Sequence, residues 1–303
     1  MRETTLTLNW QARAMASDKD KLQALRQEID RIDNSIHDLI MERTLVVEEV
    51  RHAKRGDSIK IRPSREAEIL YRLMARHTGS FPKRELGRIW RELIVATLRF
   101  EGPFSVAVSP PEGENEYWEL TRGQYGSFTP MTRHASTRSV VEAVRTQQAT
   151  VGILPLPRPD DVERWWPLMV SDAPDMPRII ARLPFIPGDG NTNAAPQALV
   201  ICSIDQEKTG RDHSFLAIET KEDIGNNAIN KALGDAGLST VFNQLWHEPN
   251  SHIAWIYLIE IDGFIETDSD AMQRLKDALG KRINRIVQMG GYAIPLGLDD
   301  VAS

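Results

Sequence analysis

The spacing of apolar residues along the chain changes twice, and these changes divide it into three sections. From residue 18 to residue 101, apolar residues recur every three or four positions, the period of an α-helix buried along one face. Pro63 and Pro82, each with a glycine a few residues before it, interrupt this run. The pattern therefore predicts three helices, of which the first extends over about residues 19–55.

The second and third sections have the short apolar runs of β-structure. Between residues 104 and 204, such runs at 105–108, 150–154 and 197–204 stand among proline-rich loops. From residue 214 the order becomes strand, helix, strand, strand, helix, strand, which is the ferredoxin-like βαββαβ order. The expected elements are Phe215–Glu219, Asn226–Ala236, Ser239–Trp246, Ala254–Ile261, Ser269–Gly280 and Arg285–Ile294.

These changes of period predict a multidomain chain of the α and α+β classes. Its length allows two or three domains, each with its own hydrophobic core. We expect a disordered lead-in at 1–18, a helical domain at 19–102, a shortened α/β domain at 103–206 and a ferredoxin-like domain at 207–298.

The first predicted helix is too long to be covered by its own chain. At 1.5 Å per residue it would measure roughly 55 Å, whereas the next two helices have only ~15–20 residues each. Its apolar stripe is therefore predicted to need a second chain. The stripe consists of Leu22, Leu25, Ile29, Ile32, Ile36, Leu39, Val46 and Val50.

Charged residues stand at positions of these stripes where apolar residues are expected. Arg43 and Lys54 continue the stripe of the first helix and lie three turns apart on the same face. Glu66 precedes an apolar face on the second helix, and Thr97 and Glu101 end the stripe of the third. Each of the charged residues alone is more often part of a structural ion pair between helices. Their occurrence on all three helices favours a pocket for a polyanion that also carries hydroxyl or ether oxygens.

Composition narrows the classes of partner. A formal net charge of −6 gives no basic surface for nucleic acid. The single cysteine, Cys202, allows neither an internal disulfide nor a cysteine zinc site. No apolar run approaches the ~20 residues of a membrane span, and the first residues lack the pattern of a secretory signal. We therefore expect a cytoplasmic protein without membrane or nucleic-acid partners.

The helical section resembles the all-helical (AroQ-type) chorismate mutase domain found at the front of bacterial mutase–prephenate dehydratase fusion proteins. The resemblance covers about 80 residues, from Leu22 to Glu101. It is carried by the stretches LQALRQEIDRID, MERTLVVEEVRHAK, RPSREAEIL and WRELIVATLRFEG. It implies a homodimer with shared active sites, in which the long first helices cross between the subunits.

The resemblance also implies a set of substrate-binding residues. Arg43 and Arg26 of the partner subunit would hold the two carboxylates of chorismate, and Lys54 would bridge a carboxylate and the ether oxygen. Arg65 would support the carboxylate end. On one straight helix Arg26 and Arg43 would lie ~25 Å apart, so one chain could not present both to the same ligand.

The remaining implied contacts come from the second and third helices. Glu66 would accept a hydrogen bond from the ring hydroxyl, Thr97 would add a donor, and Glu101 would face the ether oxygen. Some family members have an aspartate where this chain has Arg62, so that hydroxyl contact is expected to be absent or replaced. Some have glutamine in place of Glu101, and a carboxyl donates a hydrogen bond only when it is protonated.

The implied reaction, the rearrangement of chorismate to prephenate, needs no cofactor, metal or nucleophile. The arginines would hold the enolpyruvyl arm in a near-attack geometry. Lys54 and a protonated Glu101 would stabilise the negative charge that develops on the ether oxygen. Turnover is therefore predicted to fall as pH rises, and a flat kcat/KM between roughly pH 5 and 8 would contradict this role of Glu101.

The middle section resembles a shortened prephenate dehydratase domain. The stretches FSVAVSPPEGENEY, SVVEAVRTQQATVGILPLP and NAAPQALVICSI carry this resemblance. The catalytic Thr-Arg-Phe triplet of that family is replaced here by Pro196-Gln197-Ala198, which lacks the threonine hydroxyl and the guanidinium. We therefore expect no dehydratase activity. Trp165 and Trp166 are predicted to pack this domain rather than to stack on a ligand.

The last section resembles an ACT domain, a ferredoxin-like module that often binds amino acids. Its usual ligand motifs are replaced by Gly225-Asn226-Asn227-Ala228 and Trp246-His247-Glu248-Pro249. Asn226 and Asn227 are candidates for polar contacts to a regulatory ligand, although a role in capping a helix is favoured. His247 and His252 are interpreted as loop residues, since no partner stands at metal-ligand spacing.

Taken together, these features favour a chorismate mutase with an inactive dehydratase-like section. One alternative is a bifunctional mutase and dehydratase, which the replaced triplet disfavours. Another is a non-catalytic, amino-acid-sensing dimeric module. Drift in such a module would have eroded Arg26, Arg43, Lys54, Glu66 and Glu101, which are all present.

Overall fold

The computed structural model describes most of the chain and separates it into two compact units. The described residues are 3–53, 59, 61–109, 116–159, 161, 163–188, 196–247 and 255–302, and side chains are not described at 3–17, 53 and 99–101. The first unit is Met1–Asp57 and the second is Ser58–Ser303. Each unit is described below by itself.

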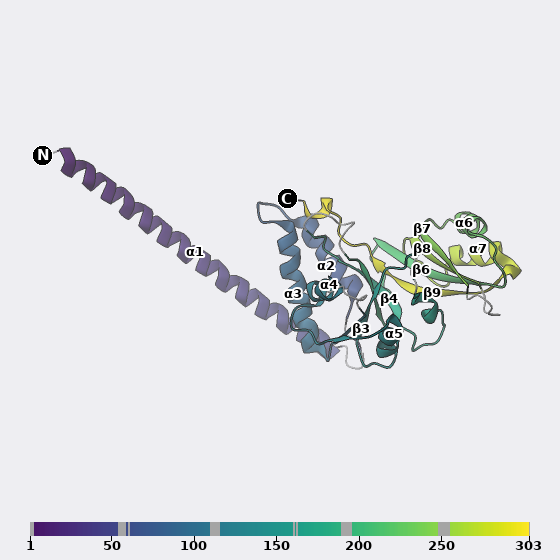
Figure 1. Ribbon diagram of the computed structural model, residues 1–303. Helices are drawn as coiled ribbons and strands as arrows, with labels where there is room; N and C mark the ends of the chain where they lie inside the picture. The colour runs from purple at the N-terminus through teal and green to yellow at the C-terminus, as the bar shows by residue number, and fades with distance from the viewer. Residues whose placement is uncertain are drawn as a thin grey trace. The chain divides into compact units, whose positions relative to one another are not determined.

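The first unit contains one continuous helix, α1 (Glu3–Ala53) (Figure 1). The disordered lead-in expected at 1–18 differs from the structure, because helical backbone already begins at Glu3. The physical reason is that the sequence has no glycine or proline before Gly56, so nothing in it ends a helix that extends toward the N-terminus.

The second unit begins with the two further helices that the prolines predicted. They are α2 (Pro63–Arg76) and α3 (Lys83–Glu101). Pro63 occupies the first turn of α2, where a backbone N–H would have no partner within the helix. The helix α3 stops at Gly102, directly before Pro103. The predicted three helices are thus confirmed.

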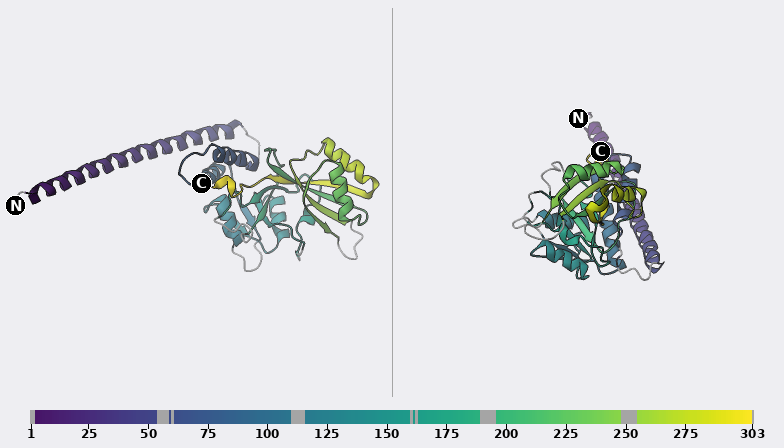
Figure 2. Two further views of the ribbon diagram at one scale, coloured as in Figure 1. Left: turned by 90° about the horizontal axis from the view of Figure 1, so that it is seen from above. Right: turned by 90° about the vertical axis from the view of Figure 1, so that its right-hand side faces the viewer.

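The rest of the second unit is built on one mixed sheet of nine strands within the described part of the chain (Figure 2). The strand order is β2-β1-β3-β5-β4-β9-β6-β8-β7. The pairs β1–β2, β1–β3 and β4–β9 are parallel, and the other neighbours are antiparallel. The strands are β1 (Val106–Val108), β2 (Met131–Arg133), β3 (Val151–Pro155), β4 (Arg178–Leu183), β5 (Ala198–Cys202), β6 (Asp212–Thr220), β7 (Thr240–Trp246), β8 (Trp255–Asp262) and β9 (Ile283–Ala293).

Four further α-helices of the described chain pack beside this sheet. They are α4 (Glu116–Tyr125), α5 (Thr137–Arg145), α6 (Asn226–Asp235) and α7 (Asp270–Leu279). The last six elements run β6-α6-β7-β8-α7-β9, and their strands lie in the order β9-β6-β8-β7. This arrangement confirms the predicted ferredoxin-like βαββαβ order.

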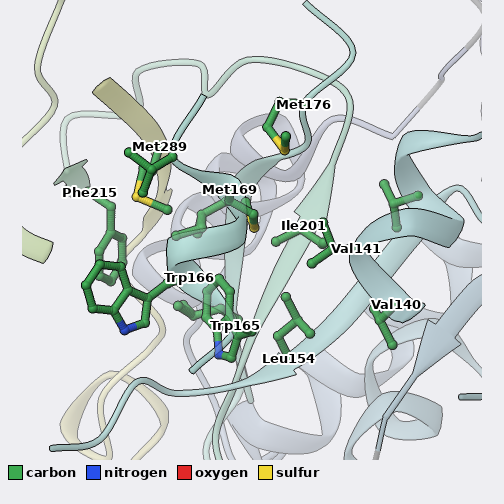
Figure 3. Packing of buried hydrophobic residues seen from close by; sticks show 14 of the residues in the cluster. Val140, Val141, Leu154, Trp165, Trp166, Met169, Met176, Ile201, Phe215 and Met289 are labelled. Atoms are coloured by element: carbon green, nitrogen blue, oxygen red, sulfur yellow. The ribbon is translucent and has the colours of Figure 1, made fainter. Parts of the chain in front are cut away.

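The ferredoxin-like part is covered on both faces of its strands. Leu216 and Ile259 pack with α6 and α7 in one core cluster. The opposite face, with Phe215 and Met289, packs with Trp165 and Trp166, which come from the middle of the chain (Figure 3). Both tryptophans are fully buried, so their predicted packing role is confirmed.

The expected division between 103–206 and 207–298 differs from the structure, in which both sections share one sheet and one core. The strand β4, which the sequence analysis did not identify, joins them by pairing with β9 at Ile179 and Gly290. Gly290 has φ +94°, and a Cβ there would lie 2.2 Å from the Ile179 carbonyl oxygen. The junction therefore requires glycine.

Candidate functional site

The apolar stripe of α1 is exposed within the first unit. Its residues from Leu22 to Leu39 have exposed fractions between 43% and 62%. Leaving this many large apolar side chains in water is unfavourable, at about 25 cal/mol for each Å² of apolar surface. An extended apolar surface of this kind is typical of an interaction face.

Two of the predicted cations lie on this helix. Arg26 is exposed, and Arg43 is half-buried and has an interaction partner. Their separation of seventeen residues corresponds to roughly 25 Å along a straight helix. The helix therefore does not bring them together. Lys54 lies outside the described residues.

The clearest polar feature of the helical pair α2–α3 is a buried ion pair. Arg91 Nη1 donates to Glu66 Oε2 at 2.5 Å, and the exposed fractions of Arg91 and Glu66 are only 4% and 6%. Glu66 Oε1 and Arg91 Nε are buried and have no hydrogen-bond partner in the described structure. Glu66 thus has one carboxylate oxygen engaged and one available.

Arg91 was not among the residues predicted from the sequence, although the sequence carries a signal for it. Arg91 precedes Ile94, Val95 and Leu98 on α3, and all three are buried. A cation on an apolar helix face is the same feature that pointed to Arg43. The predicted stripe of α3 was the face that ends in Thr97 and Glu101, and Arg91 lies on the neighbouring face.

The other predicted residues of α2 and α3 are placed differently from Glu66. Arg65 is exposed and donates to Glu68 Oε2 at 3.0 Å, one turn further along the same helix. Thr97 is buried, and its hydroxyl donates to the carbonyl oxygens of Leu93 at 3.1 Å and Ile94 at 2.8 Å. Glu101 is the last residue of α3, but its side chain lies outside the described part.

A cleft of about 810 Å³ opens beside Arg91, between α3, α4 and the turn that follows β4. Charged side chains of both signs line it, among them Arg88, Arg122 and Glu119. Phe185 and Pro196 contribute to its apolar wall. Pro196 is the first residue of the Pro196-Gln197-Ala198 sequence that replaces the dehydratase triplet. The cleft therefore borders the position of this triplet, where the threonine hydroxyl and the arginine guanidinium of that family are missing.

The next residue of the triplet belongs to a polar network across the sheet. Arg182 donates to Gln197 Oε1 at 2.7 Å and to the Tyr292 hydroxyl at 2.8 Å. Glu260 accepts hydrogen bonds from Tyr292 and, at 2.8 Å, from His213 Nδ1. Burial raises the pKa of Glu260, but these hydrogen bonds and the Arg182 charge outweigh it, so the pKa lies below its usual value.

The loop before the candidate regulatory residues Asn226 and Asn227 is hydrogen-bonded to Tyr257 of β8. The Tyr257 hydroxyl donates to Asp223 Oδ1 at 2.6 Å and accepts from the Gly225 N–H at 3.0 Å. Gly225 is the N-cap of α6 with φ +78°, and no side chain caps this helix. The favoured capping role of Asn226 and Asn227 is therefore wrong, because both follow the N-cap position and their side chains are exposed.

His247, which the sequence predicts to be a loop residue, directly follows the end of β7. The His247 ring stacks on Trp255 with centroids 4.0 Å apart, and His252 lies outside the described residues. Among the residues that the structure describes, no group of three His, Cys, Asp or Glu side chains could hold a metal ion.

None of the helices searched in this described part is long and apolar enough to cross a membrane.

Comparison with known proteins identifies the helical section. Residues 25–102 match the family model of chorismate mutase type II. This segment contains Arg26, Arg43, Lys54, Glu66 and Glu101, together with Arg65 and Thr97. The predicted resemblance of this section is thereby confirmed.

Curated relatives extend the similarity beyond this segment. A bifunctional chorismate mutase/prephenate dehydratase from Stutzerimonas stutzeri is 37% identical over 103 residues, which cover 32% of this chain and 28% of that protein. A protein of the same name from Pseudomonas aeruginosa is 30% identical over 146 residues, or 46% of this chain and 40% of that protein. The chain thus spans less than half the length of these relatives.

A solved structure is similar over part of this chain. The prephenate dehydratase from Arthrobacter aurescens, solved in complex with L-Phe, is 12% identical, with a TM-score of 0.47. The match covers 65% of this chain and 93% of that structure. A likeness at this level says nothing about activity.

Proposed function

We propose that this chain is a chorismate mutase that converts chorismate to prephenate, since its residues 25–102 match the chorismate mutase type II family. That match carries the proposal, because it spans every mutase site residue that the sequence resemblance implied. The proposed catalytic residues are Arg43, Lys54, Glu66 and Glu101, and Arg26, Arg65 and Thr97 complete the substrate-binding set.

The active form is proposed to be a homodimer. The apolar stripe of α1 is exposed to water, and packing against the same stripe of a second copy would bury both. Arg26 and Arg43 are too far apart on one helix to hold the same small substrate. In a dimer of crossing helices, Arg26 of the partner subunit would meet Arg43, so that each site takes residues from both chains.

The proposed mechanism uses positioning and charge. The arginines would grip the two carboxylates and hold the reacting carbons in contact. Lys54 and protonated Glu101 would stabilise the ether oxygen as its bond breaks, while Glu66 Oε1 would accept from the ring hydroxyl. The rearrangement is intramolecular, so the proposal invokes no cofactor or metal. We expect the reaction to take place in the cytoplasm.

We further propose that the sheet-containing unit has no dehydratase activity, and that an ACT-type ligand site is absent or altered. The Pro196-Gln197-Ala198 sequence supports the first point. The engagement of the α6 loop by Tyr257 and Asp223 supports the second. Phenylpyruvate formed from prephenate above the acid-catalysed background would contradict the first. Mutase kinetics that change with millimolar phenylalanine would contradict the second.

The decisive experiment follows the loss of chorismate absorbance. Wild-type protein is expected to consume chorismate, and Lys54→Ala is expected to lower kcat/KM by ~10²–10³-fold because a charge donor to the transition state is lost. Lys21→Ala, which removes an exposed lysine from α1, is the matched control and should leave the rate unchanged. A wild-type chain without activity would refute the proposal.

A further inference from the structure

The ion pair between Arg91 and Glu66 joins two helices at a place where neither charge is exposed to water. Burying a carboxylate without a partner costs several kcal/mol, so the 2.5 Å contact to Arg91 compensates the burial of Glu66. An exposed ion pair would contribute little and would not restrict the carboxylate. Because both side chains are buried, Arg91 also fixes the direction in which Glu66 points.

The two carboxylate oxygens of Glu66 are in different situations. Oε2 accepts from Arg91, whereas Oε1 is buried without a partner in the described structure. A buried polar atom without a hydrogen bond is costly and is usually satisfied by a ligand, a water or another chain. Arg91 therefore leaves available the one oxygen that the proposed mechanism assigns to the substrate hydroxyl.

Arg91 itself is held from the other side by the sheet-containing part of the unit. Its guanidinium carbon lies 5.6 Å from the centre of the Phe185 ring, which follows β4. Ile186 approaches α3 so closely that a Cβ at Gly87 would lie 2.9 Å from Ile186 Cδ1. Phe185 also packs with Leu70 of α2. The turn after β4 thus braces the cation that contacts Glu66.

We propose that Arg91 is a positioning residue of the mutase site, and that the turn after β4 acts on this site by holding Arg91 against Glu66. This inference rests on the proposed mutase function and on the role given to Glu66 there. It also gives the sheet-containing part of the second unit a task that requires neither dehydratase chemistry nor a regulatory ligand.

A coupling experiment separates positioning from a merely structural ion pair. The mutase kcat/KM is measured for the wild type, Glu66→Gln, Arg91→Lys and the double variant. Arg91→Lys keeps the charge but loses the fixed fork of the guanidinium. It is expected to lower kcat/KM by ~10–100-fold, the scale of a misplaced catalytic group. In the Glu66→Gln background the same change is expected to cause no further loss.

Controls keep the outcomes distinct. Arg88→Lys makes the same substitution one turn earlier on α3 at an exposed side chain, and should alter kcat/KM by less than twofold. Phe185→Leu keeps an apolar residue but removes the ring face, and is expected to lower kcat/KM several-fold. Thermal melting followed by circular dichroism checks that each variant is folded.

The possible results lead to different conclusions. If the wild type does not consume chorismate, both the proposed function and this inference fail. If the wild type is active but Arg91→Lys is neutral, or its effect is equally large in the Glu66→Gln background, only this inference fails. Should Arg91→Lys unfold, the double variant Glu66→Gln/Arg91→Met removes both charges, and a rate well below that of Glu66→Gln would overturn the inference.

Discussion

The helices α1 and α2 carry the same kind of apolar stripe, but only one of them is covered within its own unit. On α1, Leu25 and Ile29 are 55% and 57% exposed. On α2, Leu70 is fully buried and packs with Phe185 and Leu296 from distant parts of the chain. The periodicity of apolar residues therefore predicts a helix and its buried face, but not which chain supplies the covering residues.

The difference also concerns charge. On α2, the charge within the apolar face, Glu66, has its partner Arg91 on the neighbouring helix of the same unit. On α1, Arg26 is exposed next to an uncovered stripe. We interpret the contact between α2 and α3 as complete within one chain. The stripe of α1 we interpret as one half of an interface between two chains.

The largest expected effect comes from disrupting the proposed dimer interface on α1. Replacing Ile32 and Ile36 with aspartate places two carboxylates in the middle of the proposed dimer interface, where burial of each unpaired charge costs several kcal/mol. We expect the dimer to dissociate and mutase activity to disappear with it. Sedimentation equilibrium measures the first and chorismate consumption the second.

The control for this change places one charge of the same kind on the opposite face of α1. Asn34→Asp adds a carboxylate at an exposed position between the two isoleucines in sequence. It should leave both the oligomeric state and the activity as in the wild type. A double aspartate variant that remains dimeric and active would show that the α1 stripe is not the interface.

A second pair of variants compares the two stripes directly. Leu70→Ala is expected to lower the free energy of unfolding by about 2–5 kcal/mol at every protein concentration, since its contacts are intramolecular. Leu25→Ala should destabilise the protein only through the dimer, so its effect on Tm should depend on protein concentration. Thermal and chemical unfolding at several protein concentrations measure the two effects. A concentration-independent effect at Leu25 would contradict the contrast.

The part of the fold that could be predicted is the part governed by local pattern. Pro63 and Pro82 marked the starts of α2 and α3, and the alternation of strands and helices after residue 214 indicated the ferredoxin-like order. The strand β4 was missed because its place depends on pairing with β5 and with β9, which both come later in the chain. Local sequence carries no information about such a partner.

The site shows the same limit. A carboxylate on an apolar face identified Glu66 as unusual, but its partner Arg91 depends on how α2 packs against α3. Likewise, an asparagine near a helix start favours a cap by composition, whereas the backbone at Gly225 decides which residue is the N-cap. Residue types reveal that a group needs a partner, and tertiary packing selects the partner.

A third prediction tests a polar group that is satisfied entirely within the second unit. Glu260→Gln removes the carboxylate charge that accepts hydrogen bonds from His213 and Tyr292. It should lower the free energy of unfolding by about 1–3 kcal/mol at pH 7. The pKa of Glu260 is lowered in the folded protein, so its stabilisation is present above the ordinary value of 4.5 and is lost as pH falls through the folded pKa. The difference between wild type and variant should therefore narrow in acid.

Urea unfolding at a series of pH values measures this difference. Asp262→Asn is the control, because Asp262 lies two residues further along β8, is 63% exposed and approaches the His213 ring only at 3.7 Å. It should change the stability by less than about 0.5 kcal/mol. A Glu260→Gln difference that stays constant from pH 7 down to strongly acidic pH would exclude a contribution of the Glu260 charge.

The smallest expected effect compares two helix starts of the ferredoxin-like part. Ser269 caps α7, since its hydroxyl oxygen accepts from the Met272 N–H at 3.3 Å. Ser269→Ala should therefore cost about 1 kcal/mol. Asn226→Ala removes an exposed side chain that does not cap α6, and should change the free energy of unfolding by less than about 0.5 kcal/mol. Asparagine and serine are about equally good N-cap residues. If both variants lowered the free energy of unfolding equally in denaturant, Asn226 would contribute to the stability of the start of α6.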